Sequence, residues 1–180
     1  GTNALDANTT ANENVAVGYQ ALTTNTTGAF NTALGALSLK SNTTASFNTS
    51  IGYRSLDANT TGASNTAVGL YSLLKNTTAS NNIAVGNNAL SENTTGSNNA
   101  AVGYESLQNN NTSNNTALGY QSLKANTTGD HNAAVGTNSL DANTTGAANS
   151  AVGSFSMSGN TSGSNNAAFG TSALANNTTA

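Results

Sequence analysis

A glycine recurs every 17 residues along the whole chain, and this period constrains the fold more than any other feature. The spacing runs from Gly1 to Gly170 with a single step of 16, between Gly103 and Gly119. A fixed repeat of this length indicates a stacked array. We number each repeat from its glycine as position 1, so repeat 1 begins at Gly1 and the shortened repeat 7 covers residues 103–118.

The content of one repeat predicts a single β-coil. A pair of helices needs roughly 30 residues, so 17 are too few. Segments such as Thr-Ala-Val-Gly, residues 66–69, fit a short strand with a bend at the glycine. Asn-Thr-Thr-Gly has the residues of a turn. We therefore predict an all-β fold: a β-solenoid (β-roll or β-helix) with one 17-residue coil per repeat and about ten coils. Residues 1–180 would form a single array, a segment of a longer chain, roughly 50 Å long.

Bulky apolar residues recur at positions 5 and 17, and small residues recur at positions 4 and 16. This pattern predicts a thin, uniform core with two bulky side chains per repeat. At position 5 the predicted core residues are Leu22, Leu39, Leu56, Leu73, Leu90, Leu107, Leu123 and Leu140. At position 17 they are Val17, Val68, Val85, Val102, Val135 and Val152.

Asparagine recurs at positions 8 and 14. Stacked coils place equivalent residues about 4.8 Å apart, and an amide both donates and accepts, so each asparagine can bond the one above and the one below. We predict two structural Asn ladders. The first comprises Asn8, Asn25, Asn42, Asn59, Asn76, Asn93, Asn110, Asn126, Asn143, Asn160 and Asn177. The second comprises Asn14, Asn31, Asn48, Asn65, Asn82, Asn99, Asn115, Asn132, Asn149 and Asn166.

Repeat 7 lacks one residue between these two ladders. Its sequence predicts loss of the Gly/Ala residue of position 11, with Asn110, Thr112 and Asn115 kept in phase. A corner that tolerates a change of length is expected to face solvent.

The composition argues against several classes of function. Charged residues make up 6% of the chain, the net charge is −3, and the few Lys and Arg residues are scattered singly, so nucleic acid is not an expected partner. We expect no membrane contact within this segment, because no long apolar run occurs. His131 is the only histidine and cysteine is absent. Asp6, Asp57 and Asp141 share position 6, but other repeats lack an acid there, which disfavours a calcium array. We expect no catalytic residues, no metal and no cofactor, hence no enzyme.

Three alternatives remain open at this stage. Asn-Thr-Thr matches the N-glycosylation acceptor pattern in nearly every repeat, although glycans would disrupt an inward ladder. The Thr columns at positions 9 and 10 suggest an ice-binding solenoid, although adjacent residues of a strand point to opposite faces. A carbohydrate-binding surface could use Asn and Tyr side chains.

Residues 65–73, Asn-Thr-Ala-Val-Gly-Leu-Tyr-Ser-Leu, and residues 115–123, Asn-Thr-Ala-Leu-Gly-Tyr-Gln-Ser-Leu, resemble repeats of bacterial surface adhesins and phage tail fibres. They are also similar to the head repeats of trimeric autotransporter adhesins, which are usually shorter. The resemblance covers the whole chain and implies a β-roll that packs with copies of itself. We therefore expect a non-enzymatic structural or adhesive fibre segment, located outside the cell, at the cell surface or in a virion tail fibre. Its expected partners are copies of the chain, as a trimer or filament, and a host-surface or glycan ligand is a further possibility.

Overall fold

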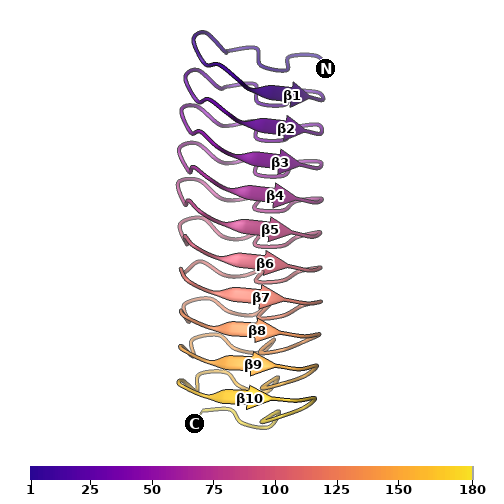
Figure 1. Cartoon of the computed structure of the whole chain (residues 1–180), viewed down its shortest axis with the longest axis vertical. Coiled ribbons are helices and arrows are strands. Elements are labelled where there is room, and N and C mark those ends of the chain that lie inside the picture. The colour runs from indigo at the N-terminus through magenta and orange to yellow at the C-terminus, as the bar shows by residue number, and fades with distance from the viewer. Residues whose placement is uncertain (180) are drawn as a thin grey trace.

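A computed structural model describes residues 1–179 as a straight stack of coils, one per repeat (Figure 1). Each of the first ten repeats ends in one three-residue strand, and the rest of each coil is turn and bend. No helix occurs among the described residues, so none of them forms a helix long enough to cross a membrane. The strands are β1 Val15–Val17, β2 Thr32–Leu34, β3 Thr49–Ile51, β4 Thr66–Val68, β5 Ile83–Val85, β6 Ala100–Val102, β7 Thr116–Leu118, β8 Ala133–Val135, β9 Ser150–Val152 and β10 Ala167–Phe169.

The ten strands form one parallel sheet in sequence order. Equivalent positions pair throughout, as Ala67 with Ala84 and Ala101 with Ala117. The register therefore passes through the shortened repeat without a slip. The predicted all-β solenoid is confirmed, and side chains at one position form columns along the rod.

Tight corners let 17 residues close one coil. Positions 3, 5 and 13 are left-handed in nearly every repeat, for example Tyr71 (φ 58°), Leu73 (φ 48°) and Asn81 (φ 62°). The glycine at position 1 has φ between 123° and 138° from Gly18 to Gly170, a region that residues with a Cβ avoid. A Cβ on Gly69 would also lie 2.6 Å from the carbonyl oxygen of Gly86. Glycine therefore recurs every 17 residues for two reasons: the backbone conformation at position 1 and the close approach of neighbouring coils there.

The core has leucine from one wall and alanine from the other. The predicted position-5 leucines from Leu22 to Leu140 are fully buried, and so is Met157. They pack with the small residues of position 16, such as Ala67 and Ala84. The buried serines of position 4 cross the coil, as where Ser55 Oγ donates to the Ala67 carbonyl over 3.0 Å.

The prediction that position 17 lies in the core is wrong. Val17, Val102 and Val152 are exposed, and Val68, Val85 and Val135 are half-buried. Successive side chains of a strand point to opposite faces, and here position 16 points inward while positions 15 and 17 point outward. The physical reason is the narrow interior: leucine from the facing wall leaves room for alanine opposite it.

The position-8 column forms the predicted amide ladder. Each Nδ2 donates to the Oδ1 of the preceding repeat over 2.7 to 3.2 Å, as Asn42 does to Asn25 and Asn59 to Asn42. The same Nδ2 donates to the position-11 carbonyl of its own repeat, as Asn59 does to Gly62 over 2.9 Å. From Asn25 to Asn160 these side chains are buried. The bond from Asn110 to Asn93 is missing, and at the C-terminal end of the ladder Asn160 Oδ1 likewise has no hydrogen-bond partner.

The position-14 column also forms a ladder, in which the amides are bonded mainly to backbone groups and two steps add an Nδ2 to Oδ1 bond. Each Oδ1 accepts the backbone N–H of the next position-14 asparagine over 2.9 to 3.0 Å, as Asn48 Oδ1 does from Asn65 N. Each Nδ2 donates to the position-11 carbonyl of the next repeat over 2.8 to 2.9 Å. The strand pairing begins one residue later, so the amide oxygen satisfies an N–H that the sheet does not. Both asparagine columns therefore converge on the position-11 carbonyls.

Candidate functional site: the outward face of the sheet

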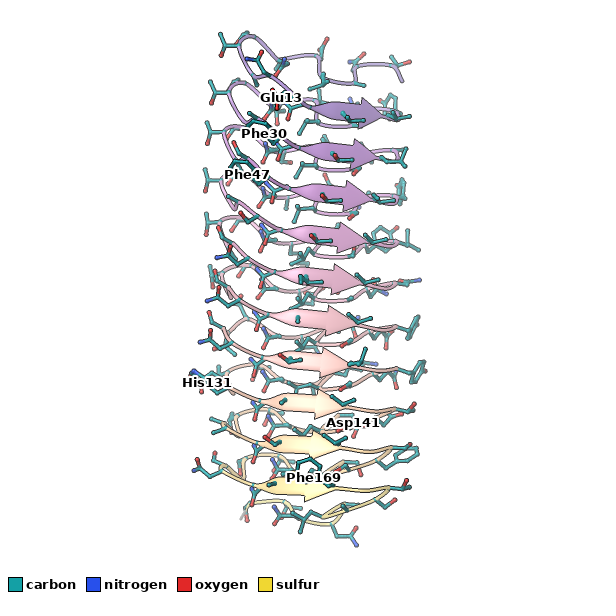
Figure 2. All side chains as sticks on the ribbon, viewed as in Figure 1. Glu13, Phe30, Phe47, His131, Asp141 and Phe169 are labelled. Carbon is teal, nitrogen blue, oxygen red and sulfur yellow. The ribbon has the colours of Figure 1, made fainter. Side chains whose placement is uncertain are left out.

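The outer face of the sheet runs along all ten strands of the rod. It presents positions 15 and 17 of every strand, and none of these residues is charged. Position 17 is a continuous column of Val, Leu, Ile and, in β10, Phe169; Leu34 is 45% exposed and Leu118 47% exposed. Position 15 alternates among Thr, Val, Ile, Ala and Ser. Figure 2 shows these side chains standing on the strands, with Phe169 on the last of them.

Aromatic side chains border this face on both sides. At position 13, Phe30 and Phe47 are exposed and stack with ring centroids 5.2 Å apart (Figure 2). At position 2, Tyr104 and Tyr120 are exposed and stack at 5.3 Å. The stacking follows from the coil spacing, which places equivalent rings one above the other. Exposed apolar patches of this extent indicate an interaction surface.

A polar cluster lies beside the tyrosine pair. The Glu105 carboxylate is paired with Lys124 Nζ at 2.6 Å and accepts Gln121 Nε2 at 2.8 Å. The hydrogen bond from Lys124, with further ones from Gln121 and Tyr104, lowers the pKa of Glu105 against a smaller effect of burial. The hydrogen bond of Tyr104 to this carboxylate in turn raises the pKa of the Tyr104 phenol. These contacts fix the side chains, but they do not hold a nucleophile next to a base.

Two smaller ion pairs lie elsewhere on the rod. Arg54 Nε donates to Asp57 Oδ2 over 2.6 Å, and this hydrogen bond raises the pKa of Arg54. Lys75 and Glu92 pair at 2.5 Å between neighbouring repeats. Asp57 is buried, whereas both partners of the Lys75–Glu92 pair are exposed, and exposed pairs contribute little to stability.

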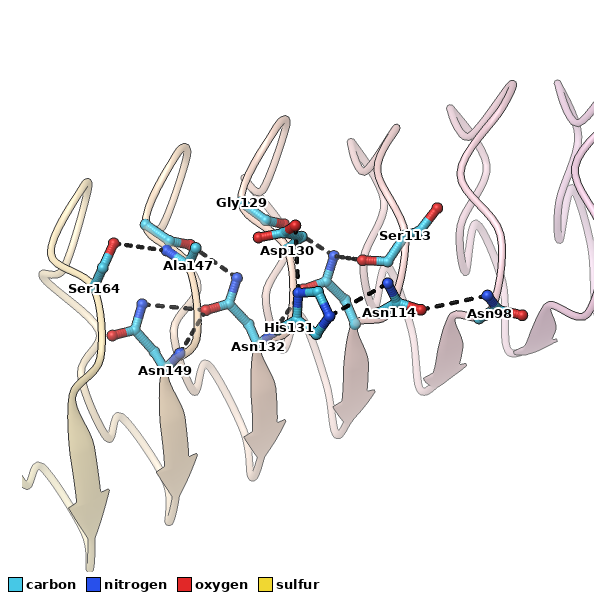
Figure 3. A network of polar contacts seen from close by, with 12 residues as sticks. Asn98, Ser113, Asn114, Gly129, Asp130, His131, Asn132, Ala147, Asn149 and Ser164 are labelled. Atoms are coloured by element: carbon cyan, nitrogen blue, oxygen red, sulfur yellow. Dashed lines mark hydrogen bonds and ion pairs between the residues drawn. The ribbon is translucent and has the colours of Figure 1, made fainter.

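His131 belongs to an exposed chain of polar contacts at the position-13 corner (Figure 3). Its Nδ1 lies 3.3 Å from Asp130 Oδ2, and its Nε2 lies 3.5 Å from Asn114 Nδ2. Asn114 in turn accepts Asn98 Nδ2 at 3.3 Å. No nucleophile takes part in this chain, and the ring is 62% exposed. The arrangement is a surface contact between repeats.

The structure shows neither a pocket nor a metal-binding group within residues 1–179. The position-6 aspartates are far apart in the stack: Asp57 pairs with Arg54, and Asp141 Oδ2 accepts Asn138 Nδ2 at 3.0 Å. The candidate site is therefore a surface rather than a cavity.

The threonine columns occupy a bend and not a strand. Position-9 hydroxyls donate to the position-9 carbonyl of the next repeat, as Thr60 Oγ1 does to Thr77 over 3.0 Å. Position 10 is exposed from Thr27 to Thr95. The expectation that the two threonines point to opposite faces of a strand does not apply to this bend.

Comparison with known proteins adds nothing to this geometry. The chain matches no protein-family model, no curated protein and no solved structure.

Sequence reasoning placed the leucine core and both asparagine columns correctly but missed the outward face. The alternation of bulky and small residues at positions 15 to 17 carried the signal, because bulky, small, bulky across a short strand fits a small residue facing inward. It also missed Asn111 in repeat 7, where an asparagine replaces the usual Thr at position 9.

Proposed function

We propose that this chain is a non-enzymatic structural segment of a fibre, in which copies of the chain pack through the outward sheet face. The observation that carries the proposal is the continuous column of partly exposed Val, Leu, Ile and Phe at position 17. Covering such a face with another molecule stabilises the resulting assembly, because burying apolar surface is favourable by about 25 cal/mol per Å².

The dimensions of the face suit a specific interface. Ten strands at about 4.8 Å give a strip roughly 48 Å long. From position 13 to position 2 the strip is roughly 20 Å wide, so its area is on the order of 1,000 Å². Each partner of a standard interface contributes about that much. The uncharged strands and aromatic borders fit the composition of an interface core.

The occupant of the face is a second copy of the same chain. Identical in-register columns on two copies meet at the same spacing, so apolar column packs against apolar column along the whole rod. The resemblance to adhesin and tail-fibre repeats supports a trimer or filament outside the cell, at the cell surface or in a virion tail fibre. It also supports an adhesive role, with a host-surface or glycan ligand.

Sedimentation analysis of the wild-type chain and of Val102→Lys tests this proposal. The wild-type chain should sediment as an oligomer, and a lysine in the middle of the face should shift it toward monomer with unchanged circular dichroism. Thr44→Lys, at the exposed position-10 corner of a regular repeat, is the matched control and should remain oligomeric. A wild-type chain that is a folded monomer at every concentration would overturn the proposal.

A second candidate is ice binding, which the exposed position-10 column favours. Thr27, Thr44, Thr61, Thr78 and Thr95 form an uninterrupted row of exposed threonines in repeats 2 to 6. Thermal hysteresis with shaped ice crystals, lost on Thr61→Lys, would support this function. Its absence in the wild-type chain would eliminate it.

A further inference from the structure

In the shortened repeat 7, a side-chain oxygen takes the place of a backbone carbonyl as a hydrogen-bond acceptor. In most regular repeats the backbone N–H groups of positions 9 and 10 both donate to the position-9 carbonyl of the next repeat. Thr60 N and Thr61 N, for example, lie 2.9 and 3.2 Å from the Thr77 oxygen. At repeat 7 the acceptor is instead the side-chain Oδ1 of Asn111, at 2.9 Å from Thr94 N and 3.0 Å from Thr95 N.

This geometry also corrects the predicted site of the deletion. Thr112 occupies the position-11 place, since its carbonyl accepts both Asn110 Nδ2 at 2.7 Å and Asn99 Nδ2 at 2.8 Å. The missing residue is thus the exposed threonine of position 10. The corner faces solvent as expected, and Asn111 supplies the acceptor that the shorter backbone cannot.

The repair leaves the amide ladder broken at the same place. Asn110 Nδ2 donates to Thr112, and its Oδ1 accepts Asn115 Nδ2 at 3.1 Å and Asn126 Nδ2 at 2.7 Å. Asn93 Oδ1, in repeat 6, is consequently buried with no hydrogen-bond partner. A second buried acceptor without a partner, Asn87 Oδ1, lies in the same repeat, whereas Asp141 Oδ1 and Asn160 Oδ1 lie singly in repeats 9 and 10. An unsatisfied buried polar atom is costly.

We propose that the junction between repeats 6 and 7 is a built-in opening point of the rod. In a stacked array each repeat is held mainly by its neighbours, so one weak junction divides the stack into two cooperative blocks. The blocks are residues 1–102 and 103–179. Opening at this junction separates β6 from β7 while each block keeps its own leucine core.

Hydrogen exchange of the full chain, read by NMR at single amides, tests the proposal. The N–H groups of Leu90, Glu92 and Ala100 cross this junction, to Ser106, Gln108 and Asn115. Those of Leu56, Ala58 and Thr66 cross the regular junction from repeat 4 to repeat 5. We expect the first set to exchange about tenfold faster than the second, as for loss of one buried hydrogen bond. If the rod opened only by fraying from its ends, the first set would exchange more slowly than the second, because repeat 6 is more central than repeat 4.

A restored repeat provides the matched variant. Asn111→Thr and Thr112→Gly, with one threonine inserted between them, recreate the regular Asn-Thr-Thr-Gly turn. This variant should slow exchange at Leu90, Glu92 and Ala100 to the rate of the repeat-4 set. Equal rates for the two sets in the wild-type chain, or no slowing in the restored chain, would overturn the proposal.

Shortening a regular repeat in the same way should create a second weak junction. Deleting Thr61 together with Thr60→Asn and Gly62→Thr should accelerate exchange at Leu39, Ser41 and Thr49, whose N–H groups cross from repeat 3 to repeat 4. If this variant fails to fold, the restored chain still decides the question.

Discussion

Asn59 Nδ2 lies 3.0 Å from Asn42 Oδ1 and 2.9 Å from the Gly62 carbonyl, so one buried amide joins two coils and closes the turn of its own. Its Oδ1 accepts Asn76 Nδ2 at 2.8 Å. Asn59→Ala removes all three bonds and leaves Asn42 Oδ1 without a donor. We expect the free energy of unfolding to fall by about 2 to 4 kcal/mol, measured by urea denaturation.

Asn109→Ala is the control for this change. Asn109 is an exposed asparagine one residue before the same ladder in repeat 7, and its substitution should change stability by at most about 0.5 kcal/mol. Equal effects at Asn59 and Asn109 would show that the ladder contributes nothing to stability.

Leu73 and Val102 test which bulky column is the core. Leu73 is fully buried, so Leu73→Ala should cost about 2 to 5 kcal/mol through lost packing and a cavity. Val102 is 37% exposed, so Val102→Thr should cost less than about 1 kcal/mol when measured on the monomer. Thermal unfolding at low protein concentration distinguishes the two, and comparable losses would return position 17 to the interior.

Glu105 should make stability depend on pH in the acid range. Its pKa is lowered in the folded chain, chiefly by the hydrogen bond from Lys124. The folded state is therefore favoured above the usual pKa of 4.5, and this contribution is lost as the pH falls through the lower folded pKa.

Glu105→Gln removes this dependence. We expect a loss of at most about 1 kcal/mol at neutral pH, shrinking to nothing below the folded pKa, as measured by denaturation from pH 7 to pH 2. Glu13→Gln, at an exposed corner, is the control for the substitution itself. A difference between Glu105→Gln and the wild-type chain that grows toward low pH would contradict the assigned direction.

Glycosylation provides a separate test of the inward asparagines. The position-8 amides are acceptor motifs by sequence, but from Asn25 to Asn160 they are buried and their Nδ2 atoms are hydrogen-bonded. In a host that glycosylates secreted proteins, the folded fraction should carry no glycan on Asn59 or Asn76. Peptide mass mapping would detect any attached glycan. Glycan on either residue in well-folded protein would refute the assignment of these side chains to the interior. Asn111 and Asn114, which begin acceptor motifs in the shortened repeat, are exposed and provide the accessible comparison.

The sequence by itself determined the stacked coil, its period, the leucine core and the columns of asparagine. These follow from phase alone, because any in-register stack of identical repeats aligns Leu56 with Leu73 and Asn59 with Asn76. The glycine period also has a local cause, since only glycine readily adopts the conformation seen at Gly69.

Only the tertiary structure decided which side of the three-residue strand faces inward. In so short a strand, alternation alone allows either position 16 or positions 15 and 17 to point inward. The leucine of the facing wall fills most of the narrow interior, so the small alanine of position 16 fits there and the valine of position 17 does not. Tertiary contacts also decided the bonding of the position-14 asparagines, whose partners are backbone groups of the next coil. At repeat 7 they decided that Asn111 replaces a carbonyl, because the sequence shows that a residue is lost but not which hydrogen bond must be supplied in its place.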